Sequence, residues 1–489
     1  MSAEMQDSTS TTRSNTAAPE ERRLEGNLGT MDIVFTVLAF NAPLSVFVGF
    51  VPVIIGVGNG LGAPIAYLAA GLLILLFAVG FTAMGRKLPN AGAFYAYITA
   101  GLGRPIGLGA AFLAVVSYIF VLVGGYAFGG IVLEALVRDV LGGPDITWWA
   151  WVLVLMATAG TLGYFKISLS AKILTVTMTL ELIVVVAYNA VVFATGGQDG
   201  QTGAPLVVSN IFSGNLGLAA LFGIVCFSGF EATAVFREEA RDPARTVPRA
   251  TYIAIITMAV LYATSAWAMI TGIGTSAVVD ASASDPTGTV FASIQQYLGN
   301  VAVDLVNVLL VTSIFAANLA THNVTTRYLY SLSVDRVFHP RLGRVHARHG
   351  SPHVASIATS IIAVAFLTVL VLARSDGATI YAVLVGIGGY ALILLMLLTS
   401  IAVVRFFAAD RTGSLSWSRT IAPVIAALGL VGALALASAN LGTMVGGNQA
   451  LASGLMMLFY TCLVVGVVYA LILRRRSPEV YQRIGRQDV

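Results

Sequence analysis

The feature that most constrains this chain is the length of its uncharged apolar segments. Ile33 to Gly85 contains no charged residue, and neither does Ile421 to Leu473. A membrane-spanning helix needs roughly 20 apolar residues, so each stretch can hold two spans joined by a short turn. Over the whole chain 57% of residues are hydrophobic and 10% are charged, whereas soluble domains contain about 25% charged residues. The composition therefore predicts an all-α integral membrane protein.

Apolar segments bounded by charge, glycine or proline predict twelve transmembrane helices. The expected limits are 30–57, 62–84, 105–137, 148–165, 170–195, 212–240, 250–273, 299–333, 354–373, 379–405, 420–440 and 449–473. Before the third span, residues 92–103 predict a helix near the interface. Residues 1–29 are polar and rich in Ser and Thr, so we expect a disordered cytosolic tail. Residues 474–489 form a second predicted cytosolic tail.

The distribution of basic residues predicts the orientation in the membrane. Of the 27 lysines and arginines, the odd-numbered connections hold only Arg138 and Arg374. Positive charge is enriched in cytoplasmic loops. An even number of spans places both ends of the chain on one side, so both termini are expected in the cytoplasm, with the chain in the plasma membrane.

Two of the predicted spans contain helix-breaking residues. In span 1, Asn41 can cap a half-helix and Pro43 suits the first turn of the next one. Pro43 donates no helical hydrogen bond, which leaves carbonyls near residues 38–40 without that partner. In span 6, Ser228 and Gly229 form the predicted break. Ordinary kinks are the alternative interpretation, because Gly and Pro are common in membrane helices.

The two breaks occupy equivalent places in two five-helix units. These units are predicted for residues 30–195 and 212–405, and helices 11 and 12 follow at 420–473. Transporters often bind their solute at the midplane between inverted repeats. Half-helix N-termini attract a carboxylate and free carbonyls attract an ammonium, so the breaks predict a zwitterion site. The candidate binding residues at the breaks are Phe40, Asn41, Ala42, Pro43, Leu44, Ser45, Phe227, Ser228, Gly229, Phe230 and Glu231.

Three further motifs give the chain a resemblance to a known family. LPNAGAFYAY (88–97), FSGFEATAVFREEARDPARTVPRA (227–250) and the segment 320–353 resemble stretches of the amino acid–polyamine–organocation permease superfamily. The resemblance covers nearly all of residues 27–475. It implies the leucine-transporter fold, with a 5+5 inverted repeat and two extra helices. It also implies solute transport driven by a proton gradient or by exchange.

The resemblance has one departure, which lies at the first break. The family usually has a Gly-x-Gly stretch there, and this chain has residues 40–45, FNAPLS, instead. Proline presets a turn where relatives use glycine freedom. The family's aromatic gate would correspond to Phe230, or to Phe227 just before the break.

Ionisable residues inside a membrane are functional candidates because their burial is costly. Glu231 follows the second break, where it can pair with a solute amine, carry a proton or cap a half-helix. Glu181 lies in span 5, where some proton-coupled relatives have a lysine, so that lysine's role cannot be carried over. Glu181 is a candidate proton carrier, and a neutral, hydrogen-bonded Glu is the alternative. His322 in span 8 is a third coupling candidate, or a packed histidine.

The walls of the predicted cavity come from spans 3, 8 and 10. Tyr118, Tyr126 and Asn318 are the candidate side chains, and 386–389 is the candidate glycine-rich wall. Asn318 and His322 are one turn apart and are expected on one face of their helix.

Several other activities have no support in the sequence. His346, His349 and His353 have roughly metal-ligand spacing, but neighbouring arginines would repel a cation, so no metal and no cofactor are expected. Both cysteines lie in apolar stretches, and no basic run is interleaved with aromatics, so neither a disulfide framework nor nucleic-acid binding is expected. No filter motif indicates a channel, and no catalytic motif indicates an enzyme.

The sequence therefore predicts a permease that moves a small solute across the bilayer by alternating access. An amino acid carried with protons is the first expectation. A polyamine or ethanolamine-type amine, or amino acid exchange, is the alternative.

Overall fold

The computed structural model describes residues 29–88, 93–165, 171–231, 233, 240–409 and 416–485. Every element assigned within these ranges is helical. The predicted N-terminal tail, apart from Gly29, lies outside them. So do residues 89–92 of the motif before span 3, Lys166, and residues 232 and 234–239 after the second break.

The first half of the described chain contains the following helices: α1 Thr30–Asn41, α2 Pro43–Gly49, α3 Val51–Val57, α4 Ala63–Gly85, α5 Ala93–Leu102, α6 Arg104–Ala135, α7 Trp148–Phe165, α8 Ala171–Thr195, α9 Val208–Ile211 and α10 Leu216–Val225. Short 3-10 turns lie at Gly60–Gly62 and Ala204–Leu206, and a π-helical turn at Leu136–Val140. The interfacial helix predicted before span 3 is α5.

The second half contains α12 Pro243–Ile273, α13 Val278–Ser284, α14 Pro286–Leu298, α15 Asn300–Val334, α16 His353–Leu372, α17 Gly377–Ala409, α18 Ala422–Met444, α19 Gln449–Arg476 and α20 Pro478–Arg483. A 3-10 turn at Pro340–Gly343 and a π-helical turn at Trp417–Ile421 complete it. Helices α13 and α14 were not predicted, because they lie in a connection without a long apolar run.

Eleven helical segments of the described chain are long and apolar enough to cross a membrane. The predicted sixth span differs, because α10 has only 10 residues before the helix stops at Val225. Its continuation falls largely outside the described residues. The fold is thus a multi-pass helical membrane protein, and the full set of twelve spans stays a prediction.

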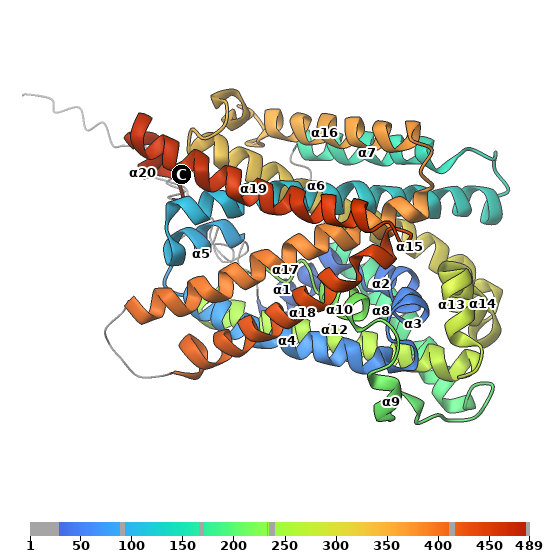
Figure 1. Ribbon diagram of the computed structural model, residues 1–489. Helices are drawn as coiled ribbons and strands as arrows, with labels where there is room; N and C mark the ends of the chain where they lie inside the picture. The colour runs from blue at the N-terminus through green and yellow to red at the C-terminus, as the bar shows by residue number, and fades with distance from the viewer. Residues whose placement is uncertain are drawn as a thin grey trace, which may run out of the picture.

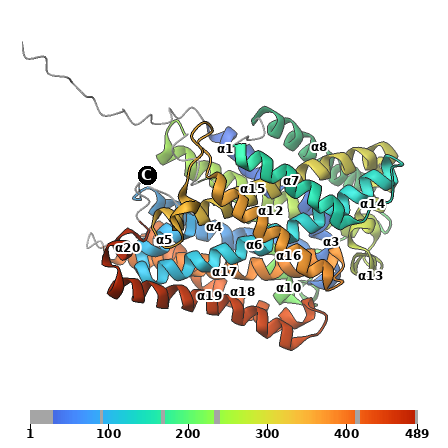
Figure 2. The same cartoon turned by 90° about the horizontal axis from the view of Figure 1, so that it is seen from above.

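The long helices form one bundle with two distinct ends (Figure 1). We call the end that carries α5 and α20 the α20 end, and the end that carries α13 and α14 the α13 end. Helix α6 is central and packs against α7, α15, α17 and α19. When the bundle is seen from above, α17, α18 and α19 lie on one side of it, and α7 and α8 lie on the opposite side (Figure 2).

Close helix crossings depend on glycine where a side chain would not fit. A Cβ atom added to Gly466 of α19 would lie 2.6 Å from the Cα atom of Gly109 in α6. Gly454, on the same helix, has no other atom within 4 Å of such a Cβ atom. The α6–α19 crossing therefore requires a small residue at 466 but not at 454.

We predict that Gly466→Val lowers the free energy of unfolding by about 1–3 kcal/mol, the usual cost of overpacking a close contact. Gly454→Val is the matched control and is expected to leave stability nearly unchanged. The measurement is the unfolding temperature of the purified protein in detergent. Equal unfolding temperatures for the two variants would contradict the crossing described above.

Candidate functional site

The first helix break lies at Ala42, between α1 and α2. Ala42 has φ 49° and ψ 68°, in the left-handed region, and Pro43 begins α2. Proline disfavours the helical conformation of the residue before it, which explains a break one residue earlier. The break thus lies where the Asn-Ala-Pro sequence predicts it.

The predicted cap at Asn41 is wrong. Asn41 is the last residue of α1, and its side-chain amide donates to the Val37 carbonyl at 3.0 Å. Ala42 occupies the cap position of α2 and supplies no side-chain hydrogen bond. Because Asn41 is still helical, its side chain points back along its own helix.

Glu181 of α8 reaches the start of α2. Its carboxylate accepts a hydrogen bond from the Ser313 hydroxyl at 2.9 Å, and the Leu44 backbone amide lies near enough to stabilise its negative charge. The Ser45 hydroxyl in turn donates to Ser313 at 3.3 Å. The side chain of Glu181 is only 1% exposed. This chain of contacts joins α2, α8 and α15 around one buried carboxylate.

The second break follows α10 and is centred on Gly229, which has φ 108°. The Gly229 amide donates to Oε2 of Glu231 at 2.8 Å, and the Tyr118 hydroxyl of α6 donates to Oε1 at 2.8 Å. Glu231 is 6% exposed. Its carboxylate therefore satisfies a backbone donor that the interrupted helix leaves free, and ties the turn to α6.

The two breaks contact each other directly. A Cβ atom at Gly229 would collide with the ring of Phe40, so the glycine backbone packs against that ring. Phe230 packs against Phe77 and Phe81 of α4, with ring centroids 5.7 and 6.1 Å away. The structure thus brings the residues of both predicted breaks together.

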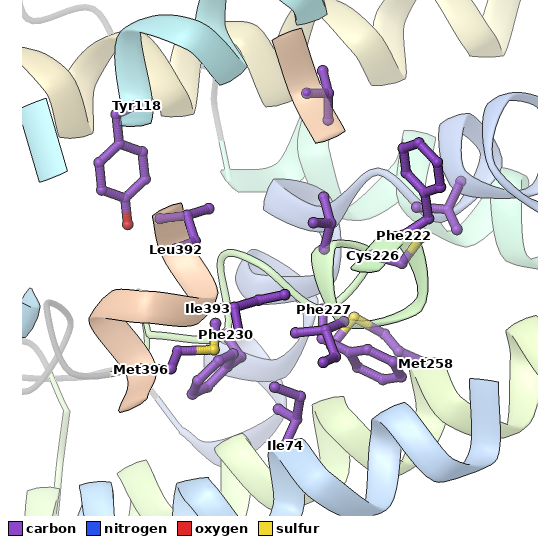
Figure 3. Close-up of a cluster of buried hydrophobic side chains, with 14 of the residues drawn as sticks. Ile74, Tyr118, Phe222, Cys226, Phe227, Phe230, Met258, Leu392, Ile393 and Met396 are labelled. Carbon is purple, nitrogen blue, oxygen red and sulfur yellow. The ribbon is translucent and has the colours of Figure 1, made fainter. Parts of the chain in front are cut away.

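Apolar side chains enclose the second break. Figure 3 shows Phe227 and Phe230 of the turn in one buried cluster with residues of α4, α10, α12 and α17, among them Ile74, Phe222, Met258, Leu392, Ile393 and Met396. Such surroundings exclude water, which strengthens electrostatic interactions at the Glu231 carboxylate.

The other predicted residues lie in the surrounding helices. Asn318 donates to the Gly125 carbonyl of α6 at 3.1 Å. His322 contacts the Ser356 hydroxyl of α16 at 3.0 Å, so the two side chains meet different helices. Tyr126 is buried on α6. Of the glycine-rich wall in α17, Gly388 accepts a hydrogen bond from Ser117 at 2.8 Å.

Two buried hydroxyl groups near the breaks, those of Ser313 and Tyr262, were not predicted from the sequence. Ser313 is the hydroxyl that contacts Glu181, and the Tyr262 hydroxyl is buried without a hydrogen-bond partner among the described residues. The Ser228 hydroxyl is also buried without a hydrogen-bond partner among the described residues. Hydroxyls in apolar helices carry no local signal, so only the packing of the helices identifies these groups.

Neither buried carboxylate has a basic partner in the part of the chain that the structure describes. The ion pairs found there involve Glu134, Asp139 and Asp242 with nearby arginines. A buried carboxylate without a cationic partner is costly. The arrangement is therefore suited to receive a proton or a solute ammonium group.

The apolar spans and the paired helix breaks define a multi-pass membrane transporter. The profile of the family described as Amino acid permease matches residues 32–478. This chain belongs to that family.

Three curated relatives show the range of solutes in their names. The chain is 25% identical to the low-affinity putrescine importer PlaP of Escherichia coli K12, over 72% of this chain and 76% of that protein. It is 25% identical to the branched-chain amino acid permease BcaP of Bacillus subtilis 168, over 70% and 74%. It is 23% identical to the lysine-specific permease LysP of Escherichia coli K12, over 63% and 64%.

We predict that Gly229→Ala slows transport by about tenfold, because a strained backbone costs about 1–3 kcal/mol and the new methyl group meets Phe40. Gly223→Ala in α10 is the control, since its added Cβ would make an ordinary contact at 3.4 Å. The measurement is the initial uptake rate in proteoliposomes, together with the unfolding temperature. Equal losses of uptake in both variants would show that the effect is not specific to the break.

Proposed function

We propose that this chain is a secondary active permease of the plasma membrane that moves an amino acid by alternating access, coupled to protons, with both termini in the cytoplasm. The observation that carries this proposal is the pair of buried carboxylates, Glu181 and Glu231, one at each helix break. Neither has a basic partner among the described residues.

The buried carboxylate of Glu231 selects the amine of the solute, and Glu181 carries the proton. An ammonium group beside Glu231 would supply the positive charge that this carboxylate lacks among the described residues. The carboxylate of an amino acid needs hydrogen-bond donors, and the unpartnered Ser228 hydroxyl is one such donor at the same turn. The solute would therefore lie beside the Phe40–Gly229 contact, close to the turn at 228–231.

Proton coupling follows if the proton and the solute prefer the same state of the transporter. Coupling of two ligands requires only that each has a different affinity for the two states. Glu231 joins the second break to α6 through Tyr118, and Glu181 joins the first break to α15 through Ser313. Protonation of either group changes contacts between helices that must move in the cycle. His322 is a third, more distant candidate.

A small amine is the second candidate solute. Two carboxylates at the two breaks suit a diamine, because each ammonium group could be neutralised by one of them. The name of the relative PlaP, a putrescine importer, points in the same direction. Exchange of two solutes, without net proton flow, is the alternative to symport.

Uptake by the purified protein in liposomes tests the proposal. Labelled leucine, lysine, histidine, glutamate, putrescine and ethanolamine are tested singly with an inward and an outward pH gradient. We expect one amino acid to accumulate only when the outside is acidic, since the proton gradient then drives uptake. Accumulation of putrescine or ethanolamine alone would establish the amine alternative. Movement only against a preloaded counter-solute would exclude symport.

The role of Glu181 is tested by Glu181→Gln. We predict that accumulation driven by the pH gradient falls to the background level, because the amide cannot carry the proton, while exchange of preloaded solute continues. Glu134→Gln is the control, since that carboxylate lies beside Arg138 at 3.8 Å, away from the breaks. Full proton-driven accumulation by Glu181→Gln would refute the assignment.

A further inference from the structure

The segment that follows α19 folds back onto the α20 end of the bundle. Figures 1 and 2 both place α20 beside α5. Ile484, just after α20, is 1% exposed. The Gly485 amide donates to the Tyr95 hydroxyl at 2.7 Å and to Oδ2 of Asp335 at 3.1 Å. Residues 478–485 are therefore docked in a built site rather than lying on the surface.

The docking site is shaped for this segment. The Tyr95 hydroxyl of α5 donates to Oδ2 of Asp335 at 2.6 Å, so one carboxylate oxygen receives both donors. Gly485 has φ 76°, and a Cβ atom there would lie 2.5 Å from the Thr99 side chain. Only glycine fits this position without strain.

Arg104, at the start of α6, holds the middle of the segment. Its guanidinium donates to the Gln482 carbonyl at 3.2 Å and lies 5.6 Å from the ring centroid of Tyr481. The Gln482 side chain is exposed. The segment thus binds to α5, α6 and the end of α15 at once, through backbone groups, one aromatic ring and one buried apolar side chain.

Helix α5 also leads from this docking site to the second helix break. Tyr97 of α5 stacks on Phe81 of α4 at 4.5 Å, and Phe94 lies 6.4 Å from Phe77. Phe77 and Phe81 are the rings that surround Phe230. One side of α5 is therefore bound to the docked segment, and the other side is packed on the rings beside the break.

We propose that residues 478–485 are an intramolecular latch that holds α5 against α15 and thereby slows the rearrangement of α4 and of the turn at 228–231. Contacts that exist in one conformation stabilise that conformation and delay the departure from it. Weakening the latch should speed the transport cycle. The effect on transport rests on the function proposed above, whereas the docking itself does not.

Docking is tested by thiol labelling. The Ile484→Cys variant, in a background with Cys226→Ala and Cys462→Ala, is treated with a water-soluble maleimide. We expect labelling much slower than that of Gln482→Cys in the same background, because position 484 is buried. Adding Tyr95→Phe should speed labelling at 484 by about fivefold, the effect of losing one ordinary hydrogen bond. Equal labelling rates at 484 and 482 would overturn the proposal, whichever solute is transported.

The effect on transport is measured in the full-length chain without cysteine substitutions. Gly485→Val and Ile484→Asp should both raise the initial uptake rates of leucine, lysine, histidine or putrescine by about fivefold through loss of the docked contacts. Gln482→Ala is the matched control and should leave uptake unchanged. Slow labelling at 484 with unchanged or reduced uptake in both variants would show a structural anchor and refute the latch. The labelling experiment also applies if no tested solute moves in the wild-type protein. It then compares the rate of maleimide labelling at position 484 with and without Tyr95→Phe. An equal rate in the two proteins would contradict reversible docking of the segment.

Discussion

Within a hydrocarbon layer every backbone polar group must find its partner inside the protein, and the rest of this structure depends on how that requirement is met at two interrupted helices. A helix satisfies its own backbone, but a break exposes donors. In this chain the carboxylate of Glu231 accepts a hydrogen bond from the Gly229 amide, and that of Glu181 lies near the Leu44 amide at the start of α2. The carboxylates that stabilise the backbone at the two breaks are therefore also the groups best suited to bind a proton or an ammonium group.

This use of side chains gives the two breaks a common electrostatic character. Each carries a buried negative charge when its acid is ionised, and each acid also receives a hydroxyl from a neighbouring helix, from Ser313 or Tyr118. Protonation or ligand binding at one of these acids therefore alters both a helix break and a contact between two helices. In the proposal above, a proton at Glu181 and a solute amine at Glu231 would favour the same conformation, and that shared preference would couple them.

The family contains relatives named for a diamine, for branched-chain amino acids and for lysine. An amine is common to all of these solutes, whereas the rest of each solute molecule differs in charge and size. In this chain the two buried glutamates, Glu181 and Glu231, lie at the breaks, and aromatic and aliphatic side chains surround the second break. The proposal above therefore gives amine recognition to Glu231, and the apolar side chains around Phe227 and Phe230 would discriminate among solutes.

The amino-acid sequence by itself determined the membrane class, the limits of most spans and the break at Ala42. These are local properties, because apolar length and the restriction imposed by Pro43 act within a few residues. Only the tertiary structure decided which partners the buried acids have. Glu181 and Ser313 are 132 positions apart, Tyr118 and Glu231 are 113 apart, and Tyr95 and Gly485 are 390 apart. Such contacts depend on how helices pack against one another, as does the docking of residues 478–485. Hydrophobic periodicity carries no information about that packing.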